Sequence, residues 1–166
     1  AHSRLSVLAA LDDMLGNPST TEMEIHKSLE TNLWVLGPEY SLMSSNETLS
    51  KVIERYTSDA FKGEGANKRP DLLLAQDTPD EILLIEFKKP SITLNRDHQN
   101  QAKKYRDHLL ARFPNARIRI LVVGGTISNS IPSPVDGDTT FASYAETINK
   151  ARTHLGWLLR EMTSRS

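Results

Sequence analysis

The spacing of hydrophobic residues predicts helices at both ends of the chain. Leucines in residues 4–15 recur at helical intervals, and Gly16-Asn17-Pro18-Ser19 then breaks the pattern. A second helix is expected to begin near Thr20 or Thr21 and to present apolar residues on one face up to Leu33. The same spacing predicts further helices over 47–56, 97–113 and 141–162.

The centre of the chain predicts a buried sheet. Residues 71–76 and 82–88 are short apolar runs joined by Asp77-Thr78-Pro79-Asp80, which is typical of a hairpin. Their apolar positions are consecutive rather than alternating, as in strands covered on both faces. Residues 118–123 predict another buried strand, and 40–43 a short one. Residues 62–69 and 128–140 are expected to be loops, the first of them basic.

This order of elements predicts an α/β domain of three layers, with a central mixed β-sheet flanked by helices. The 166 residues suffice for one full core. We expect residues 1–18 to form a lead helix and linker, and 19–166 the main domain. The N-terminus, Ala1-His2-Ser3-Arg4, lacks an initiator Met and the shape of a signal peptide. We therefore expect a domain of a longer, cytoplasmic protein with additional domains.

Composition excludes several classes of protein. A formal net charge of −1 rules out binding to nucleic acid through bulk positive charge, although a local basic patch is still allowed. The absence of cysteine excludes disulfides, thiolate metal sites and cysteine nucleophiles. No apolar run has the roughly 20 residues of a membrane-spanning helix, so we expect no membrane partner.

Charged residues occur where the predicted sheet should be apolar. Asp71 opens the first central strand, and Glu86 and Lys88 share one face near the end of its partner because strand side chains alternate. Buried charges are paired or bind metals. The cluster is therefore either a structural ion pair or a site for a divalent cation, since Mg²⁺ prefers carboxylate oxygens.

These residues resemble the signature of the PD-(D/E)xK nuclease superfamily: Pro70-Asp71 on one strand and Glu86-Phe87-Lys88 on the next. Downstream, Gln101 and Tyr105 resemble the Gln-x-x-x-Tyr motif of its exonuclease branches, and at i and i+4 they share a helix face. Residues 24–34 resemble the first helix of Shedu-type nucleases, an anti-phage defence group. The resemblance covers residues 20–125 and implies a restriction-endonuclease-like core.

The superfamily usually adds an acidic residue from its first core helix. Glu22, Glu24 and Glu30 are the candidates, and Glu24 best fits the Shedu-like stretch. The alternative for Glu24 is structural, because Thr21-x-x-Glu24 is also the pattern of a capping box at a helix start. The sequence leaves both roles of Glu24 open.

The resemblance implies a Mg²⁺- or Mn²⁺-dependent deoxyribonuclease. Asp71, Glu86 and the backbone carbonyl of Phe87 would hold the metal, and Lys88 would handle the attacking water. Substrate binding would fall to Gln101 and Tyr105. The basic residues around the cluster, among them Lys89 and Lys104, would form a rim for DNA.

Two rival functions stay open. One is a catalytically quiet module of the same fold that binds or senses nucleic acid. The other is a metal-free structural or oligomerisation domain whose charges form only an ion-pair network. A homo-oligomer is compatible with all three functions, and the sequence does not separate DNA from RNA.

Overall fold

The computed structural model describes residues 2–37, 40, 44–45, 71–78, 81–129, 131 and 137–164, and for residues 2, 44–45, 71–78, 108 and 112 it describes the backbone only. The first half of the chain contains α1 (His2–Gly16), α2 (Glu22–Glu30), the short 3₁₀-helix η1 (Leu33–Leu36) and β1 (Ser44–Ser45). The second half contains β2 (Asp71–Thr78), β3 (Glu81–Phe87), β4 (Thr93–Leu94), α4 (Arg96–Arg112), β5 (Arg117–Gly124), β6 (Thr126–Ile127), β7 (Thr139–Ser143) and α5 (Tyr144–Ser164). None of the helices in these ranges is both long and apolar enough to span a membrane.

The main sheet is mixed and has the strand order β1-β2-β3-β5-β7. Strands β1, β2 and β3 pair antiparallel, whereas β3, β5 and β7 pair parallel. The predicted hairpin between β2 and β3 is confirmed, with a register irregularity between Gln76 and Thr78 next to its turn. Helices flank this sheet, so the predicted α/β class with a mixed central sheet is confirmed.

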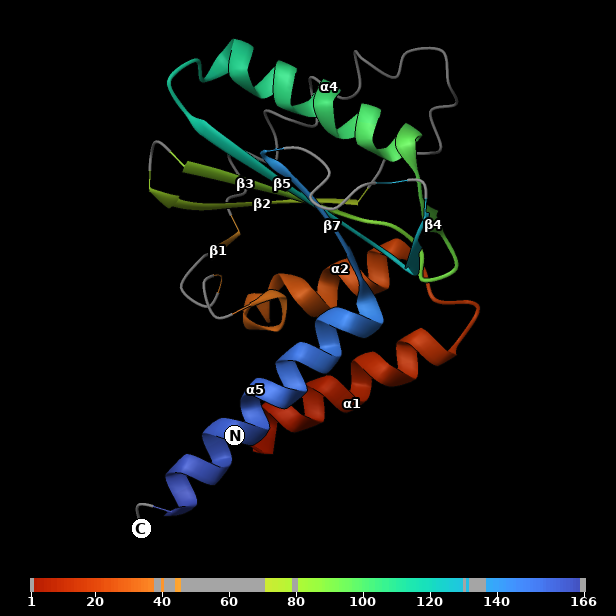
Figure 1. Cartoon of the computed structure of the whole chain (residues 1–166), viewed down its shortest axis with the longest axis vertical. Helices are drawn as coiled ribbons and strands as arrows, with labels where there is room; N and C mark the ends of the chain where they lie inside the picture. The colour runs from red at the N-terminus through yellow and green to blue at the C-terminus, as the bar shows by residue number, and fades with distance from the viewer. Residues whose placement is uncertain are drawn as a thin grey trace.

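Side-chain alternation along β3 divides the core between the two faces of the sheet. Leu83, Ile85 and Phe87 pack with α1, α2 and α5 on one face. Ile82 and Leu84 pack with α4 on the other face, which α4 covers at the top of Figure 1. Both sets are buried, which explains why the apolar residues of this strand are consecutive in the sequence.

Helix α1 belongs to the same core as the sheet. Leu8 and Leu11 are buried in the cluster that contains Phe87, and Asp12 forms an ion pair with Arg152 of α5. The boundary predicted after residue 18 therefore does not separate α1 from the domain.

Several predicted elements differ from the structure or lie outside the described residues. A two-residue strand, β1, covers Ser44–Ser45, just after the short strand predicted over 40–43. Residues 41–43, the predicted helix over 47–56 and the predicted basic loop over 62–69 lie outside the described residues.

The start of the last helix was predicted three residues too early. Residues 139–143 form β7 at the edge of the main sheet, parallel to β5, and α5 begins at Tyr144. The sequence Thr-Thr-Phe-Ala-Ser is rich in the β-branched and aromatic residues that strands favour. Ser143 then accepts a hydrogen bond from the backbone N–H of Glu146, as a helix cap does.

A close backbone contact fixes the segment that joins β3 to α4. The N–H of Gly125 donates to the carbonyl of Ile92 at 2.8 Å. A Cβ atom at position 125 would lie 1.8 Å from the backbone oxygen of Pro90, so only glycine fits there without movement of the backbone. Strands β4 and β6, which the sequence did not predict, pair beside this contact, and β4 leads the chain into α4.

Candidate functional site

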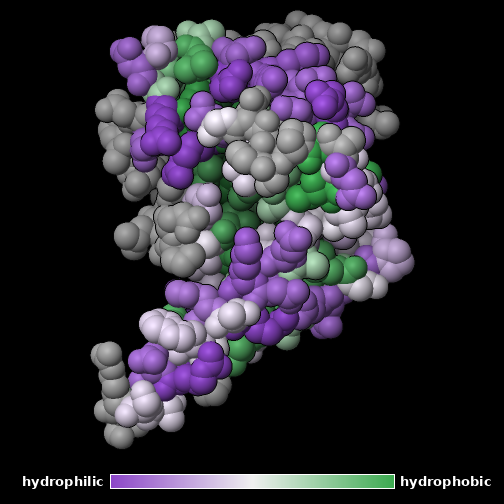
Figure 2. Space-filling view, in the orientation of Figure 1, coloured by the Kyte–Doolittle hydropathy of each residue, from purple (hydrophilic) through white to green (hydrophobic). Residues whose placement is uncertain are grey.

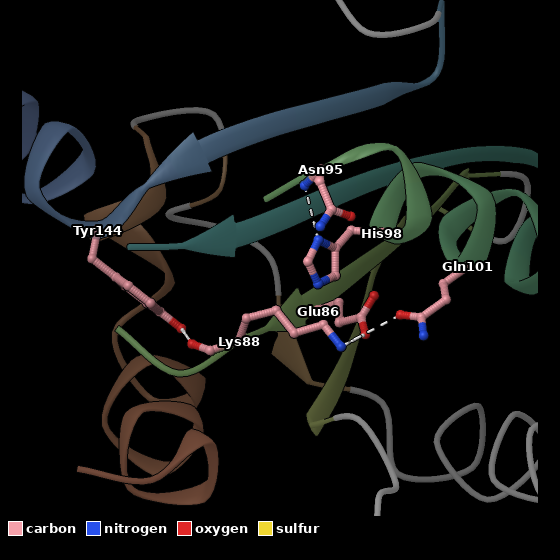
Figure 3. A network of polar contacts seen from close by, with 6 residues as sticks. All are labelled: Glu86, Lys88, Asn95, His98, Gln101 and Tyr144. Carbon is pink, nitrogen blue, oxygen red and sulfur yellow. Dashed lines mark hydrogen bonds and ion pairs between the residues drawn. The ribbon is translucent and has the colours of Figure 1, made fainter. Parts of the chain in front are cut away.

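Glu86 and Lys88 meet at the end of β3. The Nζ of Lys88 lies 2.9 Å from Oε1 of Glu86, and it also donates to Oε1 of Gln101 at 3.4 Å. Figure 3 shows the Lys88 side chain extending back along the strand so that its ammonium lies between these two acceptors. The predicted convergence of Glu86 and Lys88 is confirmed.

The Glu86 carboxylate is buried without a full set of partners. Its exposed fraction is 0%, and neither of its oxygens accepts a well-aligned hydrogen bond from the described residues. The Lys88 ammonium is at ion-pair distance from Oε1, but no such contact reaches Oε2 within the described part of the chain. A buried carboxylate oxygen in this state is costly, which makes Oε2 a natural ligand for a cation.

Two opposing effects act on the pKa of Glu86. Burial raises the pKa of the Glu86 carboxyl above its usual range, and the charge of Glu22 adds to the increase. The Lys88 ammonium acts in the opposite direction and favours the carboxylate form. A bound divalent cation would favour the carboxylate still more.

The backbone of Lys88 is held by two neighbouring elements. Its N–H donates to the carbonyl of Val123 in β5 at 2.9 Å. Its carbonyl accepts a hydrogen bond of 2.6 Å from the hydroxyl of Tyr144, the buried first residue of α5. These two bonds fix the point from which the Lys88 side chain extends toward Glu86.

Asp71 lies beside this pair in the sheet. The backbone register places Asp71 opposite Phe87 and Leu72 opposite Glu86. Directly opposed residues of a regular antiparallel pair share a face of the sheet, so this register alone gives position 71 the face of Phe87. The side chain of Asp71 lies outside the described part of the structure, and its approach to Glu86 stays a prediction.

Phe87 contributes no polar side chain to the site. Its ring is fully buried and contacts the imidazole of His26 on α2, with ring centroids 5.5 Å apart. Only its backbone carbonyl could act as the ligand that the sequence predicted.

The two predicted residues of α4 have different roles. Gln101 is partly buried and contacts the Lys88 ammonium, so it is part of the candidate site. Tyr105 is only 1% exposed and belongs to the core between α4 and the sheet, where burial and the charge of Glu86 raise its pKa. Its predicted contact with a DNA phosphate is wrong for this structure, because a phosphate cannot reach a side chain that is covered by the helix.

The first turn of α2 corrects the prediction for Glu24. Oε2 of Glu24 accepts a hydrogen bond of 2.8 Å from the N–H of Thr21, and the Thr21 hydroxyl accepts one of 3.2 Å from the N–H of Glu24. This reciprocal capping box is the structural alternative that the sequence left open. Glu22, not Glu24, is the acid of this helix whose charge affects Glu86.

His98 is a residue beside the site to which sequence reasoning assigned no role. Its Nδ1 accepts a hydrogen bond of 2.9 Å from the backbone N–H of Asn95 at the start of α4. Burial and the positive charge of Lys88 lower the pKa of His98. The sequence feature that could have identified His98 is its position as the third residue of the helix that follows Glu-x-Lys.

Polar and charged side chains gather over α4 in Figure 2. Lys89 and Lys104, which were predicted to contact DNA, are both exposed. Their exposure makes them accessible to a polyanion, and their contact with DNA stays a prediction.

A separate cavity of about 500 Å³ lies between η1, β7 and α5. Its lining includes Arg4, Trp34, Phe141, Lys150 and His154, and none of the candidate site residues. We place the chemistry at Glu86 because the cavity walls carry no comparable buried charge among the described residues.

No cluster of three or more His, Cys, Asp or Glu side chains with metal-ligand geometry occurs within the described ranges, from which the carboxylate of Asp71 is missing. The metal ligands that can be described are therefore the carboxylate of Glu86 and nearby backbone oxygens. Glu22 adds negative charge that acts on Glu86. Comparison of the chain with known protein families, with curated proteins and with solved structures finds no match.

Proposed function

We propose that this chain is a metal-dependent nuclease that hydrolyses the phosphodiester bonds of DNA. The observation that carries the proposal is the buried Glu86 carboxylate, which has one oxygen beside the Lys88 ammonium and the other without a partner among the described residues. A purely structural ion pair is stable when its remaining lone pairs are also satisfied. The second oxygen of Glu86 is instead suited to a divalent cation.

The donor chemistry fits Mg²⁺ or Mn²⁺. Glu86 offers a hard carboxylate oxygen, and the resemblance adds the backbone carbonyl of Phe87 and the carboxylate of Asp71. The register gives position 71 the face of Phe87, so Asp71 would have to reach the cation around the end of the strand. A cation held there would polarise a phosphodiester and lower the pKa of a water molecule. Glu22 contributes negative charge that increases the attraction for a cation.

Lys88 would act on the water and on the developing charge. Its ammonium is positioned by Glu86 and Gln101, and its backbone by Val123 and Tyr144. Such a fixed cation orients the attacking water and stabilises negative charge on the phosphoryl oxygens. Gln101 thereby acts as a positioning residue for Lys88.

DNA is the substrate that the surroundings favour. Exposed lysines near the site, Lys89 and Lys104, supply positive charge for the phosphate backbone although the whole chain has a net charge of −1. The Shedu-like residues of the first half support a role in anti-phage defence, which forms part of the same proposal.

Incubation of the purified chain with supercoiled and linear DNA in Mg²⁺, Mn²⁺ or EDTA tests this function. We expect cleavage in Mg²⁺ or Mn²⁺ and none in EDTA. Nicking of the supercoiled form would identify an endonuclease, and shortening of the linear form alone an exonuclease. Cleavage that continues in EDTA, or DNA binding without cleavage under every condition, would contradict the proposal.

A further inference from the structure

His98 has a tautomer that is fixed by geometry. Asn95 is the cap of α4, and its backbone N–H donates to Nδ1 of His98 at 2.9 Å. A nitrogen that accepts a hydrogen bond carries no proton, so in the neutral ring the proton is on Nε2. His98 therefore presents one N–H donor, at Nε2.

This donor points toward the candidate site. Figure 3 shows the imidazole between Asn95 and the Glu86–Lys88 pair, with its second nitrogen directed toward that pair. No acceptor for this N–H is present among the residues that the structure describes. The lowered pKa of His98, caused by burial and by Lys88, agrees with a neutral ring.

Capping alone does not require histidine at this position. A capping box ordinarily uses Glu or Gln as the third helical residue, because its side-chain oxygen accepts the same backbone N–H. The imidazole differs from these side chains in having a rigidly held second nitrogen. That nitrogen is the feature that a ligand of the site would meet.

We propose that His98 is a substrate-binding residue, and that its Nε2–H donates to a non-bridging oxygen of the phosphodiester that is cleaved. The inference rests on the proposed function and adds to it a neutral donor opposite the Lys88 cation. A role as metal ligand is disfavoured, because Nε2 would have to lose its proton to Nδ1, which faces the Asn95 N–H.

The variant His98→Gln separates this role from capping. Glutamine keeps an acceptor for the Asn95 N–H and removes the imidazole Nε2–H; its own amide N–H₂ group is not held in place by a rigid ring. His154→Gln is the matched control, because His154 is exposed on α5 and lines only the separate cavity. Asn95→Ala controls for a weakened cap, since it removes the bond from the N–H of Asp97 and keeps the imidazole.

Cleavage kinetics in Mn²⁺ and the ring nitrogen resonances of His98 provide two independent readouts. We expect His98→Gln to lower kcat/KM by about 10- to 100-fold, the effect of one hydrogen bond to a charged group, with an unchanged unfolding midpoint. We expect His154→Gln to cleave like the wild type and Asn95→Ala to cleave much faster than His98→Gln. Addition of a short DNA duplex in Ca²⁺ should shift the Nε2 resonance of the wild type.

The two failures are distinguishable. If the wild type cleaves DNA and His98→Gln cleaves it equally well, the assignment of His98 is overturned and the nuclease function stands. If the wild type does not cleave with any metal, the nuclease function is overturned. In that case a shifted Nε2 resonance on DNA addition still supports the phosphate contact, and an unshifted one overturns it.

Discussion

The Nζ of Lys88 lies 2.9 Å from Oε1 of Glu86, two residues earlier, and the carboxylate of Glu86 has no exposed surface. Each charge reduces the cost of burying the other at the end of this strand. The pair leaves Oε2 of Glu86 without a partner among the described residues, and it is from this asymmetry that a metal-dependent reaction is inferred.

Removal of the Lys88 ammonium should abolish catalysis and preserve metal binding. Lys88→Met leaves the proposed ligands in place but removes the group that handles the attacking water. We expect DNA cleavage to fall by about 10²–10⁴-fold, with Mn²⁺ still bound in calorimetry. Lys150→Met is the matched control, since Lys150 is exposed on α5, lines only the separate cavity and should retain most activity. Near wild-type cleavage by Lys88→Met would show that the active site is elsewhere.

Neutralisation of Glu86 should remove a pH-dependent loss of stability from the metal-free protein. A raised pKa means that the folded chain binds more protons than the unfolded chain above the ordinary value of 4.5, so its free energy of unfolding falls as pH rises through that window. Glu86→Gln removes this penalty and also the partner of Lys88, so in EDTA its free energy of unfolding should rise relative to that of the wild type as the pH increases. The measurement is denaturant unfolding across pH.

The pH dependence distinguishes this cause from a general change in packing. The gain from Glu86→Gln should be small below pH 4.5, grow as the pH rises, and level off above the raised pKa. Glu81→Gln, the same change at a more exposed carboxylate of the same strand, is the matched control. A difference between wild type and Glu86→Gln that does not vary with pH would refute the electrostatic explanation.

Two acids on α2 should behave differently. Glu22 acts on Glu86 by its charge, so Glu22→Gln should weaken Mn²⁺ binding by about 10-fold, as changes to groups around metal ligands do. Glu24→Gln keeps the side-chain acceptor of the capping box and should leave metal affinity and stability unchanged. Calorimetry with Mn²⁺ on both variants is the measurement. If both variants lose Mn²⁺ affinity equally, or if only Glu24→Gln loses it, Glu24 belongs to the metal site after all.

The contact at Gly125 should be important for stability. Gly125→Ala places a Cβ atom against the backbone of Pro90 in the segment that joins Lys88 to α4, and overpacking of this kind typically costs about 1–3 kcal/mol. Gly16→Ala adds a methyl group at a position with no neighbour within 4 Å and should be neutral or slightly stabilising. Thermal unfolding compares the two, and equal midpoints would mean that the loop adapts freely.

Much of the fold could be predicted because the periodicities are strong. Consecutive apolar residues in β3 and β5 identified strands covered on both faces, and period-2 alternation correctly placed Glu86 and Lys88 together. Strand β7 was missed because a five-residue edge strand next to a helix leaves a short, weak pattern. Its pairing with β5 is a long-range contact that local spacing does not contain.

The candidate site could likewise be predicted only in part from the sequence. The Thr21-x-x-Glu24 pattern carried two meanings, and only the backbone geometry of the helix start decided for the cap. Burial of Tyr105 and the proximity of Glu22 and His98 depend on how α2 and α4 pack against the sheet, which follows from tertiary contacts. The sequence identified the charged pair correctly and could not identify its neighbours.

Calorimetric titration of the wild type and of Glu86→Gln with Mn²⁺ at neutral pH tests the central claim most directly. The open oxygen of Glu86 predicts a single binding event in the wild type that EDTA reverses, and its loss in the variant although the variant is folded. Equal binding of Mn²⁺ by both proteins, or no binding by the wild type with or without a DNA duplex, would contradict a metal site at Glu86 and leave the pair as a structural ion pair.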